Sequence, residues 1–529
     1  MTGISIGVLA RWARRRKKRV AVMGCVACVV ACLVLYGWWP PSRPALGLAA
    51  TFVSGPRNTD GTVDYVEATN LAYYEPDWRE NAGSSTGSLL GSAVLRQRLI
   101  SGREWGERTA QTFQPWGFPP FVGYGRREAL ASLLDRSWKA GEKQHVEEWL
   151  NANAEVLSFI EGSTEADQLH LPLVAAVNKR VCPGDPPQPR EHPILMYARV
   201  PALDRLDEIA ECLAIRATRA GDSATPKNHW RDVRTCYRLG RLVGQCPTWG
   251  AYFLSDLITQ TAFRAHSCLL AEGRLDGLED EVCRDLSALP RIRRAWERVG
   301  IDVRFHGLDT AMLFYRGVSL ESFCERVDDS VPSHGDDRYH VDWNRSLGEF
   351  NRWCDQAVTV WKCESLAEFS RKRAALMGRL RQEGVLLRDP PSVWFWVRLG
   401  RFGRARCTRI LLAFLATEIA NCRPPLEELR GDAIVRLGQL AAKVKRFRAT
   451  KGKFPSSLRE GARDLGREAL VDPFSGKPFL LRSARDVCVL RSVGPDGVPE
   501  KPVAAGVKEC DDIVVRLRWR PRATGEMRQ

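Results

Sequence analysis

Two segments carry side chains that could hold a metal ion or perform nucleophilic chemistry. Segment 83–87 fits the nucleophile pattern GxSxG with Ser85 at its centre, but the apolar strand that such a turn requires does not precede it, so we interpret it as a polar turn. Segment 328–344 matches no known ligand motif, and solvated loop residues are the favoured interpretation. Its metal-ligating residue types are His334, Asp336, Asp337, His340 and Asp342.

Two basic segments could meet an anionic partner. Four arginines fall on one face of an expected helix at 226–243: Arg231, Arg234, Arg238 and Arg241. Acids of the preceding helix, such as Asp207, Glu208 and Glu211, are their expected partners, with solvent as the alternative. Segment 393–409 interleaves aromatic residues with arginines, which suits a membrane surface or single-stranded nucleic acid. We interpret it as a core-packed helix entry with exposed cations.

The N-terminal residues indicate where these segments lie. Residues 11–19 hold seven cationic side chains and no acid, and residues 20–39 hold no charge. Twenty helical residues span about 30 Å, the thickness of a bilayer core. This pattern predicts a single transmembrane anchor at 20–39 in the cell membrane, with 1–19 in the cytoplasm and the bulk of the chain outside it. Nucleic acid is therefore not an expected partner, despite a net charge of +16.

Two other readings of this segment remain open. A cleaved signal peptide has a shorter apolar core and a small-residue cleavage site, whereas this core ends in Trp38 and Trp39. A lipoprotein signal could place a lipid on Cys32, but the apolar run continues for seven residues beyond it. Both observations favour the uncleaved anchor.

The elements that follow predict a mainly α protein. We expect a linker at 40–57 and an irregular extracytoplasmic helical domain at 58–425, without a 34-residue repeat. Apolar periodicity predicts helices at about 203–220, 226–243 and 249–272, the last beginning after Thr248 and ending at Gly273. A capping box at Ser365 and Glu368 opens a further helix that runs to about residue 384.

The pattern changes after residue 425. A long helix that ends near Gly452 precedes three strand-like segments, 478–482, 487–493 and 512–519. We expect a small α+β domain at 426–520, able to fold alone, with 521–529 as a tail. The 13 cysteines outside the anchor show no CxxC spacing. Cys488 and Cys510 could form a disulfide if their strands are neighbours, and two free thiols are the alternative.

This C-terminal region resembles the major pseudopilins of type II secretion, in which a long helix precedes a short antiparallel sheet. The matching residues are Gly452, Phe454, Pro455, Leu458, Asp472, Pro473, Gly476, Pro478, Ser492, Gly494, Pro495, Asp496, Gly497, Asp511, Asp512 and Ile513. The resemblance implies a calcium site at Asp496, Asp511 and Asp512. Lys501 and Lys508 lie nearby in the sequence and could neutralise these acids instead. The N-terminus lacks the processing site and the helical glutamate of pilins.

The rest of the chain resembles a set of planctomycete-type membrane-anchored proteins. The resemblance rests on residues 60–70, 80–82 and 230–248 and on the C-terminal region. Many of these proteins carry a histidine at the position of Tyr237. These proteins have no assigned activity, and if that histidine has a catalytic role in them, this chain lacks it.

The sequence therefore favours a non-enzymatic envelope protein with a structural or interaction role, without a catalytic residue, a cofactor or a small-molecule substrate. No cofactor is expected, and calcium at Asp496, Asp511 and Asp512 is the metal ion that the pseudopilin resemblance implies. The expected partners are the membrane, through 20–39, and other envelope proteins. A component of a type II secretion or pilus-like apparatus is one alternative, and a hydrolase or metal enzyme within the helical domain is another.

Overall fold

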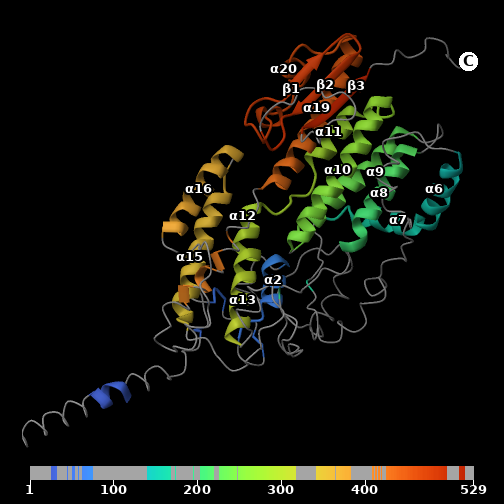
Figure 1. The fold of residues 1–529 in the computed structure, drawn as a ribbon. Helices are drawn as coiled ribbons and strands as arrows, with labels where there is room; N and C mark the ends of the chain where they lie inside the picture. The colour runs from blue at the N-terminus through green and yellow to red at the C-terminus, as the bar shows by residue number, and fades with distance from the viewer. Residues whose placement is uncertain are drawn as a thin grey trace, which may run out of the picture.

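The computed structural model has a mainly helical fold with one small antiparallel sheet, which confirms the mainly α part of the prediction (Figure 1). The structure describes residues 26–31, 44–45, 51–53, 57–58, 62–74, 140–167, 173, 195, 203–219, 225–246, 248–316, 341–363, 365–382, 408–409, 411–413, 415–416, 419, 425–496 and 512–518.

Helices α8, α9 and α10 form the centre of the molecule, and local signals in the sequence predict their limits well. They span Leu203–Arg219, Pro226–Val243 and Trp249–Glu272. The Thr248 hydroxyl accepts a hydrogen bond from the backbone N–H of Ala251 at 2.9 Å, and Gly273 ends α10 with φ of 79°. This left-handed conformation favours glycine, so Thr248 and Gly273 fix the two ends of α10 through local chemistry alone.

Two further groups of helices complete the helical part of the chain. The first group precedes α8 in the sequence and comprises α2 (Tyr65–Tyr74), α6 (Ala140–Ala152) and α7 (Ala154–Ser163). The second group follows α10 and comprises α11 (Glu279–Ser287), α12 (Ala295–Arg298), the π-helical turn η3 (Val299–Val303), α13 (Arg304–Tyr315), α15 (Trp343–Trp361) and α16 (Leu366–Gln382). The Ser365 hydroxyl accepts from the N–H of Glu368 at 3.3 Å, which is one of the two hydrogen bonds of the predicted capping box.

The C-terminal region contains the long helix α19 and the sheet. Helix α19 (Leu426–Lys451) ends at Gly452 and is followed by α20 (Leu458–Gly461) and the 3₁₀ turn η5 (Arg467–Leu470). Strands β1 (Leu480–Ser483), β2 (Val487–Ser492) and β3 (Ile513–Arg518) pair antiparallel in the order β1-β2-β3. The predicted three-stranded meander is confirmed.

Two hydrophobic cores organise the chain. The first joins α6–α11 with α19 and the sheet, and its members include Leu213, Tyr237, Leu269, Leu440 and Val515. The second joins residues near 53–72 with α12, α13, α15 and α16 and with residues 411–419. Helix α19 is buried on most sides because α10 and α11 pack against it as well as the sheet. The C-terminal region therefore shares its core with the helical bundle.

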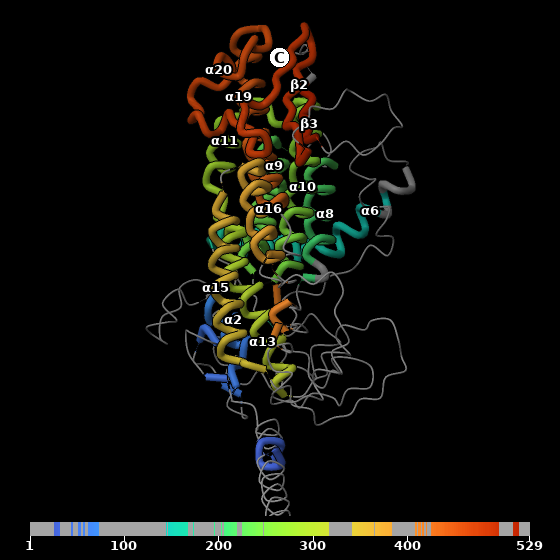
Figure 2. The backbone as a smooth tube through the Cα atoms, turned by 60° about the vertical axis from the view of Figure 1, so that its left-hand side comes forward, coloured from blue at the N-terminus to red at the C-terminus, as the bar shows by residue number. Residues whose placement is uncertain are grey.

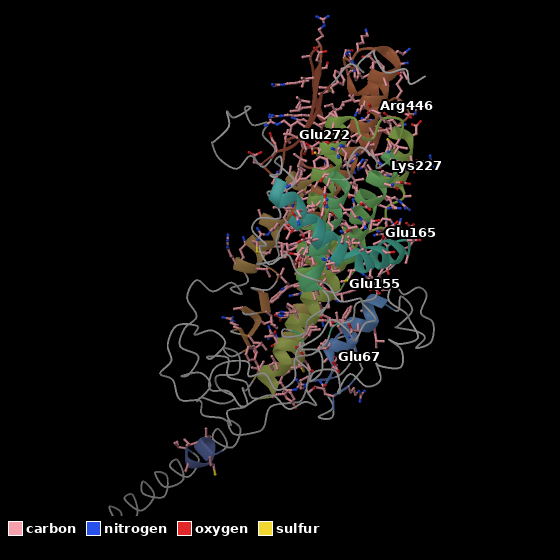
Figure 3. All side chains as sticks on the ribbon, turned by 90° about the vertical axis from the view of Figure 1, so that its right-hand side faces the viewer. Glu67, Glu155, Glu165, Lys227, Glu272 and Arg446 are labelled. Carbon is pink, nitrogen blue, oxygen red and sulfur yellow. The ribbon has the colours of Figure 1, made fainter. Side chains whose placement is uncertain are left out.

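The long body has the sheet at one end and residues 26–31 beyond the other (Figures 1 and 2). Figure 3 shows Arg446 of α19 near the sheet end and Glu67 of α2 near the opposite end. Residues 26–31 form a helical segment that lies apart from the body. Across the part of the chain that the structure describes, no helix has both the length and the apolar character to span a bilayer. Most of the predicted anchor, 20–39, lies outside this part.

The expected linker also has a structured portion. Thr51 and Val53 are buried, and the Tyr65 hydroxyl donates to the backbone oxygen of Thr51 at 3.0 Å. Phe52 lies between them with φ of 65°, and its ring covers the guanidinium of Arg304 at 4.0 Å. Residues 51–53 therefore belong to the second core rather than to a free linker.

Candidate functional site

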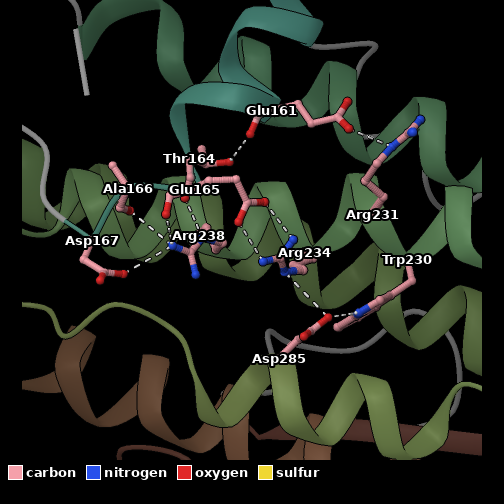
Figure 4. A network of polar contacts seen from close by, with 10 residues as sticks. All are labelled: Glu161, Thr164, Glu165, Ala166, Asp167, Trp230, Arg231, Arg234, Arg238 and Asp285. Atoms are coloured by element: carbon pink, nitrogen blue, oxygen red, sulfur yellow. Dashed lines mark hydrogen bonds and ion pairs between the residues drawn. The ribbon is translucent and has the colours of Figure 1, made fainter. Parts of the chain in front are cut away.

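The arginines of α9 lie against elements other than the preceding helix, and Figure 4 shows three of them, Arg231, Arg234 and Arg238. Arg231 forms an ion pair with Glu161 of α7 at 2.9 Å. Arg234 donates two parallel hydrogen bonds, at 2.8 and 2.9 Å, to the carboxylate of Glu165. The expected partners were Asp207, Glu208 and Glu211 of α8, so pairing with acids is found but the acids come mainly from elsewhere.

Arg238 holds the end of α7 by a different type of contact. Its side chain is buried, and it donates to the backbone oxygens of Thr164, Glu165 and Ala166 (Figure 4). These oxygens follow the last turn of α7, where carbonyl groups have no partner within the helix. A buried guanidinium there supplies both hydrogen bonds and a favourable charge at the negative end of the helix dipole. Arg238 is therefore a C-terminal cap supplied by another helix.

The same arrangement recurs at the ends of α8, α9 and α10. Arg274 donates to the Thr218 oxygen at 2.6 Å, in the last turn of α8. Lys445 of α19 donates to the Leu270 oxygen at 2.5 Å, in the last turn of α10. Arg298, fully buried, donates to the oxygens of Gly244, Cys246 and Thr248 between α9 and α10. These cations stabilise the fold from within, so the basic composition does not by itself indicate an anion-binding site.

Charged residues also join α9 and α12 to the start of α19. Arg294 contacts Glu428 at 2.6 Å and Asp432 at 3.2 Å, and Arg241 lies 3.5 Å from Asp432. The second oxygen of Glu428 accepts from the N–H of Ala295 at 2.8 Å. Burial lowers the pKa of Arg294, but Glu428 and Asp432 more than offset this and hold it above its ordinary value. The cluster links the two hydrophobic cores, and no sequence motif marked it.

A buried histidine contacts Tyr237, the position that the family resemblance singled out. His266 of α10 is fully buried, and its Nδ1 lies 3.4 Å from the Tyr237 hydroxyl. Its Nε2 has no hydrogen-bond partner within the described residues. A Cβ at Gly438 would lie 3.2 Å from the ring, so glycine allows α19 to approach closely. Burial first, and the charge of Lys445 second, lower the pKa of His266 to about 3.

The structure brings together the two halves of the pseudopilin-like motif. Asp472 is almost completely buried, and its carboxylate accepts hydrogen bonds from the Ser492 hydroxyl at 2.9 Å and the Val493 N–H at 3.0 Å. It also accepts from the N–H of Phe474 at 3.1 Å. Asp472 thus ties the turn before β1 to the end of β2. This structural role accounts for both parts of the motif.

Two of the three proposed calcium ligands lie within the described residues. Asp512 forms an ion pair with Arg491 of β2, and its side chain is completely inaccessible to solvent. Asp496 lies in the turn that follows β2. Asp511 and the two neighbouring lysines, Lys501 and Lys508, lie outside the described residues. Arg491 thus already supplies a counterion for one proposed ligand, and calcium binding remains a prediction.

The other sites proposed from sequence are mostly outside the described residues. These include Ser85, the loop residues His334, Asp336, Asp337 and His340, and segment 393–407. Asp342, the last of the loop acids, caps α15 by accepting from the N–H of Arg345 at 3.3 Å. Cys488 is a free, buried thiol opposite Leu517, whereas Cys510 is outside the described residues, so their disulfide also remains a prediction.

Comparisons with protein-family models, with curated proteins and with solved structures find no match for this chain. A search of the described residues for three or more histidine, cysteine, aspartate or glutamate side chains placed to hold a metal ion likewise finds no such group. Function therefore has to be argued from the geometry above.

Proposed function

We propose that the protein is a single-pass, membrane-anchored envelope protein that acts as a non-enzymatic scaffold and projects its body from the external face of the cytoplasmic membrane. The observation that supports the anchor is the exposure of Val26, Val29 and Val30, at 56%, 57% and 52%. They lie on the helical segment 26–31, apart from the body. Apolar side chains gathered in this way favour a hydrocarbon environment.

The contacts inside the body support a scaffold role. Arg238, Arg274, Arg298 and Lys445 each tie the end of one helix to another element through buried or partly buried hydrogen bonds. Such long-range caps hold the helices in fixed relative positions. A body of this kind can present a binding surface at a constant distance from the membrane.

A fusion experiment tests the proposed topology. A reporter that is active only outside the cytoplasm, fused after Gln529, is expected to be active, and a cytoplasm-only reporter at the same point is expected to be silent. Neutral residues in place of the cationic run 14–19 should weaken or invert this orientation, because that run holds the N-terminus inside. Activity of the cytoplasmic reporter alone would exclude the anchor in this orientation.

A role in a type II secretion or pilus-like apparatus is the second candidate. The contacts of Asp472 with Ser492 and Val493 favour it, since they join the two motif halves shared with pseudopilins in one structural unit. Crosslinking from a photoreactive residue at position 482 to a subunit of such an apparatus would support this candidate. Loss of the chain without any change in secretion or pilus assembly would count against it.

A further inference from the structure

The sheet has one buried face and one face, called the open face below, that is exposed at the end that carries Arg482, Val487 and Arg516. On β2, Cys488 and Leu490 are buried, as are Val515 and Leu517 of β3, and helices α10 and α19 pack on this side. Alternate residues of a strand point to opposite faces. The open face therefore carries Arg482 from β1, Val487, Val489 and Arg491 from β2, and Val514 and Arg516 from β3.

The register places two exposed arginines on either side of a valine. Val489 is paired with Arg482 of β1 and with Arg516 of β3, so these three side chains form one row across the sheet. Neighbouring strands are about 4.8 Å apart, which separates the two arginine backbones by about 10 Å. Both arginines are exposed, and neither has an ion-pair or hydrogen-bond partner among the described residues. Val487, next to Val489 on the same face, is 38% exposed.

The next row shows which ligand chemistry suits this face. Its central residue, Arg491, forms an ion pair with the carboxylate of Asp512. The chain itself thus pairs an arginine of this face with a carboxylate, at the end of the face that is shielded from solvent, where the Arg491 side chain is 12% exposed and the Asp512 side chain is completely buried. Arg482 and Arg516 offer two further guanidinium groups, which bind carboxylates through paired hydrogen bonds. Val489 adds an apolar contact between these two charges, and Val487 adds another beside them.

We propose that the open face of the β1–β3 sheet binds an acidic peptide segment of a partner protein, with carboxylates on Arg482 and Arg516 and an aliphatic side chain over Val489. The proposal deepens the scaffold function and rests on it for the location of the partner. The sheet lies at the end of the body opposite residues 26–31, so the bilayer that anchors the chain is not within its reach (Figures 1 and 2). Carboxylates at alternate positions of an extended peptide lie about 7 Å apart, and flexible arginine side chains can span that spacing.

The test uses the purified full chain in a neutral detergent and a fluorescent, blocked decapeptide of alternating glutamate and valine. Fluorescence anisotropy at physiological ionic strength gives the dissociation constant. The double variant Arg482→Gln/Arg516→Gln should bind about tenfold more weakly, at roughly three- to fivefold for each exposed contact. Arg485→Gln is the matched control, since Arg485 is exposed in the β1–β2 turn and off the open face. It should bind as the parent chain does.

A charge reversal makes the test specific for the face. Arg482→Glu/Arg516→Glu should reject the glutamate peptide and bind a lysine–valine peptide more tightly than the parent chain does. Equal binding by the parent, the double glutamine variant and the Arg485→Gln control would overturn the proposal. Loss of heparin binding in the double variant without any loss of peptide binding would also overturn it and would assign the face to an anionic polysaccharide.

The outcome is distinguishable from that of the topology experiment. Peptide binding is measured on the purified chain and does not depend on its orientation in the membrane. If the external reporter is inactive but peptide binding still depends on the arginines, the binding surface stands and its partner lies in the cytoplasm. If the external reporter is active but peptide binding does not depend on the arginines, the anchor stands and the proposed binding surface is rejected.

Discussion

Lys445 of α19 donates a hydrogen bond to the backbone oxygen of Leu270, at the end of α10, and forms an ion pair with Asp276 at 2.6 Å. Its side chain is almost fully buried, with 7% exposed. The contact joins positions separated by 175 residues in the chain. One ammonium group thus fixes the C-terminal region against the central helix of the body.

Lys445→Met should lower the free energy of unfolding by about 1–3 kcal/mol, because it leaves the buried Leu270 oxygen without this donor while retaining most of the side-chain volume. Denaturant unfolding followed by circular dichroism measures the change. Lys451→Met is the control, since Lys451 is exposed at the end of the same helix and should change stability by less than about 0.5 kcal/mol. Equal effects of the two substitutions would contradict the capping role of Lys445.

The free energy of unfolding should decrease as the pH is lowered, because of His266. Its pKa is about 3 in the folded chain and near the ordinary 6.5 when unfolded, so only the unfolded chain gains a proton between these values. The stability that the neutral ring contributes is complete above about pH 6.5 and decreases as pH falls toward 3. In His266→Gln, unfolding free energies measured from pH 7 to pH 4 should decrease less steeply than in the parent chain. Parallel pH curves would remove His266 as a cause of acid sensitivity.

Asp472→Ala should destabilise the C-terminal region strongly. The substitution leaves Ser492, Val493 and Phe474 without the carboxylate that accepts from them, at an expected cost of about 2–4 kcal/mol. Hydrogen exchange should quicken first at the amide of Val493. Asp472→Asn keeps the shape and one acceptor and should have an intermediate effect. Asp486→Ala, in the exposed β1–β2 turn, serves as the control and should leave exchange unchanged.

The melting temperature of the full chain should be the same in millimolar calcium and in chelator. Arg491 already neutralises Asp512, and Ca²⁺ would have to displace it to gain that carboxylate. A rise in melting temperature with calcium, lost in Asp512→Ala, would instead support the site that the pseudopilin resemblance implies.

Residues 426–520 should not form a native fold alone. Sequence analysis led to the opposite expectation, but Leu437, Leu440 and Gly438 of α19 lie in a core shared with α10 and α11. The isolated fragment would expose that surface to water, and we expect a poorly dispersed NMR spectrum and fast hydrogen exchange. A dispersed spectrum with slow exchange would show that the sheet alone suffices to stabilise α19.

Local chemistry accounts for what the sequence could predict. Thr248 and Gly273 bound α10, Gly452 ends α19 in a left-handed conformation, and alternating apolar residues mark the strands. These signals act over a few residues and do not depend on contacts with distant parts of the chain. The helix limits at 226–243 and 249–272 follow directly from them.

Long-range partners could not be predicted in the same way. Arg238 caps a helix that ends 74 positions earlier, and Glu428 contacts Ala295 across 133 positions. No spacing rule connects such residues, because the packing of whole helices decides which ones meet. The sequence marked the arginine face of α9 for its regular spacing but could not identify α7 as its partner. It gave no sign of the cluster around Glu428.

Because α19 lies late in the chain, the core around α10 is completed only late in synthesis. Helix α10 cannot complete its core until α19 has been made, and the 175 positions between Leu270 and Lys445 take roughly 9–35 s at ordinary translation rates. During that interval the apolar surface of α10 that later meets α19 has no cover from its final partner. A nascent chain in this state is a substrate for chaperones and proteases. Chains truncated before residue 426 would keep that surface permanently, so quality control should remove them.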